Sequence, residues 1–165
     1  MHMENLQDLL KEDLKDVYHA ENQIVKALPK MIKTATNGEL KRAMETHLAE
    51  TKEQVNRLEQ VMEMLGMPVR GKACKAMQGI IEEGKEVMSE DADDDVMDAA
   101  LIGAAQKVEH YEIATYGTLC TYAELLGLKE AKRLLGQTLE EEKKTDKLLT
   151  DLAESVINLQ AADEQ

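Results

Sequence analysis

Apolar residues in this chain of 165 residues recur at steps of three and four along four long stretches, and this period constrains the fold most. A helix places such positions on one face, whereas a half-buried strand requires strict alternation. The core must be aliphatic, because the sequence contains no Phe, no Trp and only four Tyr. Leu, Met and Ala favour helices over twisted sheets. The sequence therefore predicts an all-α protein.

Gly, Pro and Asn residues divide this pattern into segments. Asn37-Gly38 separates the first two stretches, and Gly66-Met67-Pro68 ends the second. Pro29 lies inside the first stretch, where we expect it to kink the helix or shift its end. The predicted long helices cover residues 4–35, 38–65, 94–126 and 128–158; a weaker pattern predicts a short helix over 71–88, and 160–165 is expected to be a frayed tail.

The lengths of the connections predict the topology. Tight connections join the first long helix to the second and the third to the fourth, so each pair should form an antiparallel hairpin. Nearly thirty residues connect the two hairpins. That connection can run the length of a bundle, since a helix of about 27 residues spans about 40 Å. Residues 1–165 are thus predicted to form one domain, a ferritin-like four-helix bundle with one long crossover containing a short fifth helix.

Charge and cysteine content exclude several classes of partner. The formal net charge is -13, from 33 acidic and 20 basic residues, which disfavours binding to nucleic acid or to an anionic membrane surface. The longest apolar-rich stretch, residues 99–105, is too short to cross a bilayer, and no secretory signal is visible. Cys74 and Cys120 are far apart, so no disulfide framework is indicated. We expect a cytoplasmic protein, with Cys74 partly exposed and Cys120 in the core.

Several acids fall on the apolar faces of the predicted helices, although helix charges usually face solvent. Projection at about 100° per residue places Glu21 inward on the first helix and Glu109 near the centre of the third. Glu50 lies on the shoulder of the second stripe, between inward His47 and Gln54. The full set of candidate metal-binding acids is Glu21, Glu50, Glu53, Glu109, Glu112, Glu142 and Asp146.

Facing carboxylates inside a bundle would repel one another strongly and would be penalised by burial. A pair of divalent cations would remove the repulsion and fill the oxygen valences. The alternative is a helix boundary misjudged by one or two residues, which would turn several of these acids toward water. Because the acids coincide on four helices, a dinuclear metal site is the favoured interpretation.

Four stretches of the chain carry a family resemblance. They are residues 18–23 (YHAENQ), 47–51 (HLAET), 104–114 (AAQKVEHYEIA) and 138–143 (TLEEEK). With these segments the chain resembles the YciF-like family of bacterial stress-associated, ferritin-like proteins. The resemblance implies a cytoplasmic homodimer related to rubrerythrin-type di-iron proteins, and it implies no settled reaction.

The sequence departs from the better-known di-iron pattern, in which two helices carry Glu-x-x-His. Glu53 and Thr145 stand where the two histidines would be, and His47 precedes Glu50 by three residues. Whether His47, Gln54 or His110 joins the metal shell is left open at this point. A mainly oxygen-donor site favours iron, manganese or magnesium over zinc.

Two functional hypotheses follow from these features. The first is a dinuclear centre, with iron as the favoured metal and manganese as the alternative, reacting with dioxygen or peroxide under stress. The second is a non-catalytic dimeric scaffold with a protonated or vestigial acidic cluster. Whether the protein is an enzyme is left open. A storage cage is less favoured, because no segment marks a pore for iron.

Tyr116 lies one turn past Glu112, where it could donate a hydrogen bond or simply pack.

Overall fold

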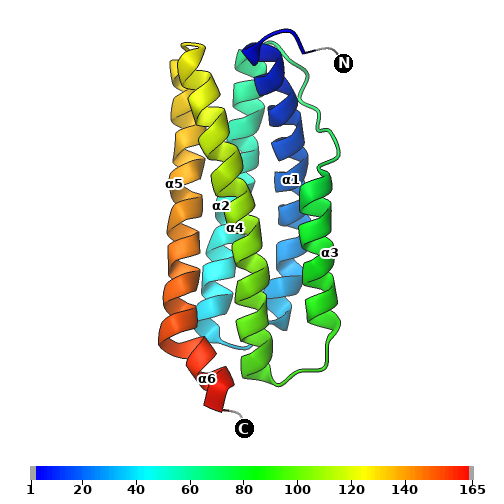
Figure 1. Cartoon of the computed structure of the whole chain (residues 1–165), viewed down its shortest axis with the longest axis vertical. Helices are drawn as coiled ribbons and strands as arrows, with labels where there is room; N and C mark the ends of the chain where they lie inside the picture. The colour runs from blue at the N-terminus through cyan, green and yellow to red at the C-terminus, as the bar shows by residue number, and fades with distance from the viewer. Residues whose placement is uncertain (1–2, 164–165) are drawn as a thin grey trace.

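The computed structural model describes residues 3–163, which form helices joined by loops (Figure 1). The elements are α1 (Leu6–Thr34), α2 (Gly38–Met64), α3 (Lys75–Ser89), α4 (Asp94–Leu125), α5 (Lys129–Leu152), a π-helical turn (Ala153–Ile157) and α6 (Asn158–Asp163). No strand occurs among the described residues, so the predicted all-α class is confirmed.

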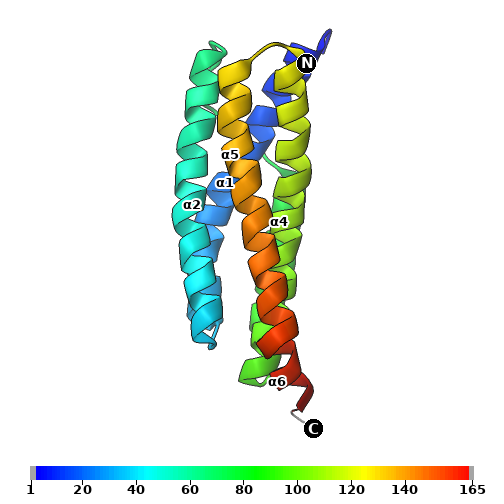
Figure 2. The ribbon, with the colours of Figure 1, turned by 90° about the vertical axis from the view of Figure 1, so that its left-hand side faces the viewer.

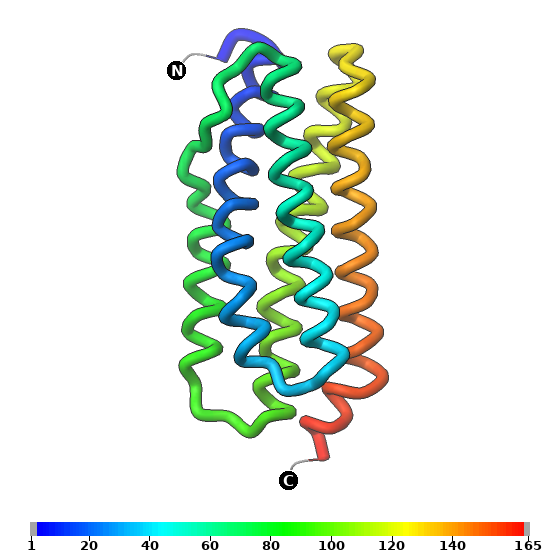
Figure 3. Tube along the Cα trace, turned by 180° about the vertical axis from the view of Figure 1, so that it is seen from behind, coloured from blue at the N-terminus to red at the C-terminus, as the bar shows by residue number. Residues whose placement is uncertain are grey.

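The four long helices form a closed bundle (Figures 1 and 2). Helix α1 packs against α2 and α4, and α5 packs against α4 and α2. The chain between α2 and α4 returns along the outside of the bundle, where α3 packs on α1 and α4 (Figure 3). This return makes α2 and α4 run in the same direction. The predicted ferritin-like bundle with one long crossover and a short fifth helix is therefore confirmed.

Side chains and glycines account for several helix ends. The side chain of Asn5 accepts a hydrogen bond from the Asp8 N–H, and that of Asn37 accepts from the Glu39 and Leu40 N–H groups. Gly66 and Gly127 adopt φ of +61° and +69°, a conformation that favours glycine, two residues after the ends of α2 and α4. Pro29 does not end α1, which continues to Thr34.

Three local predictions differ from the structure. The helix predicted over 128–158 is interrupted, because the π-helical turn follows Leu152 and keeps both Ala153 and Ile157 buried. Residues 160–163 of the expected frayed tail belong to α6, while 164–165 lie outside the described residues. The short helix begins at Lys75 instead of 71, because the Cys74 sulfur caps it by accepting from the Met77 N–H.

The expectation that Cys74 is partly exposed is wrong. Its exposed fraction is 1%, and its sulfur lies 3.2 Å from the hydroxyl oxygen of Tyr111. The crossover therefore docks closely on α4 at this point. Cys120 is half-buried and packs at the edge of the core.

Two separate apolar clusters fill the bundle, and a polar layer divides them. One cluster contains Ile24 of α1, Met44 of α2, Leu101 of α4 and Leu149 of α5. The other contains residues from the opposite halves of the same helices: Leu14, Leu58, Leu119 and Leu135. On each of the four long helices, buried polar side chains lie between the residues of the two clusters. The polar layer thus lies at mid-length, shielded from both ends of the bundle.

A buried carboxylate ties the loop between α1 and α2 to the start of α4. Asp98 is 1% exposed and accepts hydrogen bonds from the Thr36 N–H at 2.8 Å, the Thr36 hydroxyl at 2.7 Å and the Asn37 N–H at 2.7 Å. Hydrogen bonds to charged groups each contribute about 1.5–3 kcal/mol, and unpaired buried donors are penalised. This one side chain therefore holds the hairpin loop against α4.

We expect Asp98→Ala to lower the free energy of unfolding by about 3 kcal/mol, because it leaves two backbone N–H groups without their acceptor. Urea denaturation measures the effect. Asp91→Ala, at an exposed position in the loop before α4, is the control and should change stability by less than about 0.5 kcal/mol. Equal stabilities of the two variants would show that Asp98 does not anchor the loop.

Candidate metal centre

Each of the four bundle helices contributes ionisable side chains to the polar layer. Glu21 comes from α1, His47 from α2, Glu109 and Glu112 from α4, and Glu142 from α5. The four glutamates are 0% exposed and His47 is 4% exposed. Ligand atoms of His47, Glu109, Glu112 and Glu142 all lie within 4.8 Å of one another. We refer to Glu21, His47, Glu109, Glu112 and Glu142 as the central cluster.

The helical period explains why these side chains converge. Glu21 follows Val17 by four residues and precedes Ile24 by three, so it shares their inward face. On α4, Glu109 and Glu112 occupy the same face between buried Ala105 and buried Tyr116. The acids therefore continue the stripes that bury the apolar residues on either side of them.

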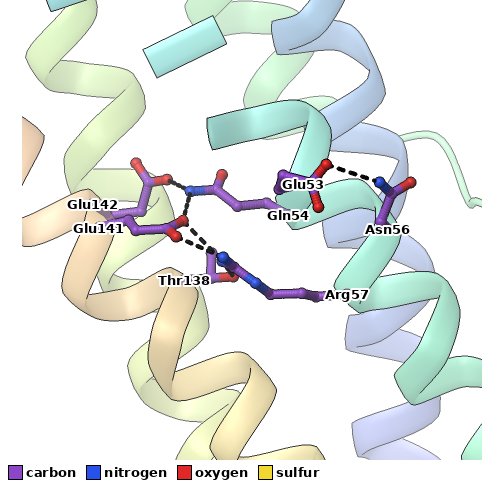
Figure 4. A network of polar contacts seen from close by, with 7 residues as sticks. All are labelled: Glu53, Gln54, Asn56, Arg57, Thr138, Glu141 and Glu142. Carbon is purple, nitrogen blue, oxygen red and sulfur yellow. Dashed lines mark hydrogen bonds and ion pairs between the residues drawn. The ribbon is translucent and has the colours of Figure 1, made fainter. Parts of the chain in front are cut away.

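Neutral polar side chains contact the cluster. The Tyr116 hydroxyl donates to Oε1 of Glu21 at 2.5 Å, and it is fully buried. Nε2 of Gln54 donates to Oε1 of Glu142 at 2.5 Å and to Oε2 of Glu141 at 3.0 Å (Figure 4). These contacts orient one carboxylate on α1 and one on α5.

An ion pair supports this arrangement from outside the cluster. Arg57 donates to both carboxylate oxygens of Glu141, at 2.6 and 2.8 Å, and to the Thr138 hydroxyl at 3.2 Å (Figure 4). Because Glu141 also accepts from Gln54, the pair connects α2 to α5 next to Glu142. A bidentate arginine–carboxylate pair fixes geometry more firmly than a single contact.

With the carboxylates ionised, many polar atoms of the central cluster and of neighbouring Gln54 have no hydrogen-bond partner within residues 3–163. They are Oε2 of Glu21, both ring nitrogens of His47, Oε1 of Gln54, both carboxyl oxygens of Glu109 and of Glu112, and Oε2 of Glu142. Nε2 of His47 lies 3.0 Å from Oε1 of Glu109, but the two are not aligned for a hydrogen bond. Buried polar atoms are almost always paired in folded proteins, so a concentration of unpaired acceptors suits a bound cation.

Burial dominates the electrostatics of the cluster. It raises the pKa of Glu21, Glu109 and Glu112, and the charge of neighbouring Glu142 raises each of these pKa values further. Burial also lowers the pKa of His47 and raises that of Tyr116. Without a cation the acids therefore favour their protonated forms, while a bound cation would favour the ionised forms.

Of the seven acids predicted from sequence, four lie in the central cluster: Glu21, Glu109, Glu112 and Glu142. The structure does not bring the other three into it. Glu50 is half-buried beside Thr46 and Lys144, and Glu53 is exposed, 3.3 Å from the Asn56 side-chain nitrogen. Asp146 is half-buried and contacts His110 at 3.1 Å. Each of these three positions is turned away from the bundle axis by the helical rotation.

In the middle of α2 the buried residues are His47, Thr51, Gln54 and Leu58. His47 and Gln54 are the two residues whose contribution the sequence left open. The sequence indicates their inward position through the spacing 47–51–54–58, which continues the apolar stripe of α2. Glu50 and Glu53 each precede a residue of this stripe by one position, which places them beside it. His110 is exposed and points to Asp146 instead of the cluster.

The fold and the central cluster together define a ferritin-like helical bundle with buried carboxylates and a histidine at mid-length. The chain belongs to the DUF892 family, named for a domain of unknown function, whose profile matches residues 5–162. It is 48% identical over 162 residues to protein YciF of Escherichia coli K12, covering 98% of both chains. The resemblance to the YciF-like family is therefore confirmed.

Solved structures agree with this assignment. The crystal structure of the E. coli stress protein YciF matches with 48% identity and a TM-score of 0.90, over 94% of this chain and 99% of that one. YcfI of Rhodopseudomonas palustris, for which a structural role has been suggested, matches with 48% identity and a TM-score of 0.87, over 89% and 94% of the two chains. A Xanthomonas campestris protein, 23% identical with a TM-score of 0.75 over 98% and 99%, shares the fold.

Within residues 3–163, none of the helices contains a segment that is long and apolar enough to span a membrane.

Proposed function

We propose that this bundle binds a dinuclear metal centre through Glu21, His47, Glu109, Glu112 and Glu142. Iron is the favoured metal and manganese the alternative. The observation that carries the proposal is the set of unpaired carboxylate and imidazole atoms from α2, α4 and α5 that lie within 4.8 Å of one another. Unpaired buried acceptors at this density are difficult to explain by packing alone.

The charge of the cluster supports two cations over one. Four ionised carboxylates carry four negative charges, which two divalent cations would balance. A single divalent cation would leave two uncompensated charges in a buried layer, where unpaired charge is strongly penalised. Carboxylates can bridge neighbouring cations, and a set of oxygen donors with one imidazole suits iron or manganese.

The surrounding residues would orient these ligands. Tyr116 holds Glu21 through its hydroxyl, and Gln54 holds Glu142 while itself supported by Glu141 and Arg57. Partners of this kind fix the orientation of a ligand and tune its basicity. The two apolar clusters on either side would exclude bulk water from the centre. The Tyr116 hydroxyl also carries a proton within hydrogen-bond distance of a cluster carboxylate.

A bound ferrous pair would supply electrons for the reduction of dioxygen or peroxide. The E. coli relative is described as a stress protein, and we propose by analogy that this chain acts in the response to oxidative stress. The cytoplasm and a homodimeric assembly are the setting that we propose for it, as the family resemblance implies.

Anaerobic loading with ferrous iron, followed by gel filtration and elemental analysis, tests the proposal. We expect about two iron atoms per chain. The double variant Glu109→Gln/Glu142→Gln should retain less than one, because it replaces two charged ligands with neutral amides. Glu53→Gln, on an exposed position of α2, is the matched control and should retain two. Substoichiometric iron in the unaltered protein would contradict the proposal.

A second candidate is a structural role, as suggested for the R. palustris relative. The observation that favours it is the raised pKa of Glu21, Glu109 and Glu112, which lets the cluster persist as neutral carboxyl groups. Such a dimeric scaffold would bind no stoichiometric metal. Its stability would be unchanged or increased by Glu109→Gln/Glu142→Gln, and it would not respond to metal.

A further inference from the structure

A cavity of about 110 Å³ lies between α1, α3 and α4 and reaches the central cluster. Its walls are apolar and are formed by residues such as Ile24, Met31, Ile80, Ile81, Ala105 and Val108. His47 and Glu109 also line it, and these two residues belong to the cluster. The cavity is therefore a space next to the proposed metal centre, and the crossover helix α3 forms one of its walls.

The outer end of the cavity is marked by exposed lysines. Lys26 and Lys30 of α1 and Lys85 of α3 line it and are exposed, whereas His47 and Glu109 are buried. The cavity thus extends from the surface, between α1 and α3, to buried side chains of the cluster. It would provide a route across the apolar packing that otherwise encloses these residues.

Gly84 keeps part of this space open. It is buried in the middle of α3 and lines the cavity, and a Cβ atom added there would meet no atom within 4 Å. Glycine is one of the least favourable residues for a helix interior. A side chain at this position would project into free space, so Gly84 is the residue at which the cavity can be filled.

We propose that this cavity binds dioxygen, a small neutral apolar molecule, and gives it access to His47 and Glu109. This inference rests on the proposed function, because the centre is the destination of the ligand. An apolar cavity of comparable size in another protein stays dry and binds xenon or benzene. Hydrogen peroxide would find few hydrogen-bond partners along the apolar walls.

Paramagnetic relaxation by dissolved dioxygen tests the proposal on the metal-free protein, so failure to bind metal does not affect the result. Under dioxygen pressure, the methyl groups of Ile24 and Ala105 should relax several-fold faster than those of Leu10 and Leu14, which are buried in the other apolar cluster. Argon at the same pressure provides the blank. Equal enhancement in the two regions would overturn the proposal.

Two variants of α3 sharpen the test. Gly84→Leu should fill the cavity and reduce the enhancement at Ile24 and Ala105 to that of Leu10. Gly79→Leu places the same side chain at an exposed glycine of the same helix and should leave the enhancement unchanged. An enhancement that survives Gly84→Leu in a folded protein would overturn the assignment of this cavity.

Discussion

Ferrous iron or manganese is expected to raise the free energy of unfolding of the metal-free protein by about 4 kcal/mol, when free metal exceeds its dissociation constant a thousandfold. For a chain of this size that corresponds to an increase in Tm of roughly 10 °C. The reason is that the ligands converge only in the folded bundle, so the metal binds the native state selectively. Differential scanning calorimetry under anaerobic conditions measures the shift.

The double variant Glu109→Gln/Glu142→Gln separates the metal effect from the intrinsic stability. Without metal it should be at least as stable as the unaltered protein, because it removes two carboxyl groups from a buried layer. With metal its Tm should not change. Glu53→Gln should retain the full shift, since Glu53 is exposed and outside the central cluster. If neither metal stabilises the unaltered protein, the scaffold function is favoured instead.

The second large effect is on the pH dependence of the metal-free protein, which should lose stability as the pH rises above 7. In the unfolded chain the glutamates are ionised at this pH, whereas burial raises the pKa of Glu109 and Glu112 in the folded bundle. The folded state therefore binds more protons than the unfolded state, and stability falls with pH. Each retained proton contributes a slope of about 1.4 kcal/mol per pH unit, so Glu109 and Glu112 together give about 3 kcal/mol per unit. Burial raises the pKa of Glu21 to about 8, so this group adds to the slope up to that pH.

Chemical denaturation between pH 7 and 8 measures this slope, below the range in which the cysteines of the unfolded chain ionise. His47 does not interfere, because its pKa is lowered by burial and the imidazole is neutral in both states above pH 7. Glu109→Gln/Glu112→Gln should remove most of the slope, while Glu50→Gln, outside the cluster, should leave it almost unchanged. Saturating metal should also remove the slope, because the carboxylates are then ionised. A flat profile for the metal-free protein would show that the cluster acids are already ionised.

The helical fold was predictable because it depends on local pattern and connection length. The three- and four-residue period places Glu21, Glu109 and Glu142 on the inner faces, and all three are buried. The long connection between the hairpins requires a crossover. These features follow from helix geometry and connection length, and they need no knowledge of how the helices pack.

The register of α2 was harder to determine, because its inward stripe is interrupted by polar residues. His47, Thr51 and Gln54 occupy the buried positions, while Glu50 lies only one residue before Thr51. A search for acids therefore selects the shoulder position, although the helical rotation turns it outward. The spacing of His47 and Gln54 indicates that both face inward. Only tertiary packing shows that they lie next to carboxylates from α4 and α5.

Other features depend on the docking of the crossover and could not be read from a single segment. Burial of Cys74 requires contact with Tyr111 of α4, which is 37 residues away. The cavity beside the cluster exists because α3 packs against α1 and α4 with Gly84 facing inward. In the sequence, Gly84 only interrupts a weak helical pattern. That it lines a cavity becomes clear only when the helices are packed together.

X-ray diffraction at the iron absorption edge, from a crystal loaded anaerobically with ferrous iron, tests the metal centre most directly. We expect two anomalous peaks at mid-length of the bundle, bounded by Glu21, His47, Glu109, Glu112 and Glu142. The same measurement on Glu109→Gln/Glu142→Gln crystals should show weaker peaks or none. Anomalous density confined to surface acids, with none among these five side chains, would contradict a metal-binding function for the central cluster.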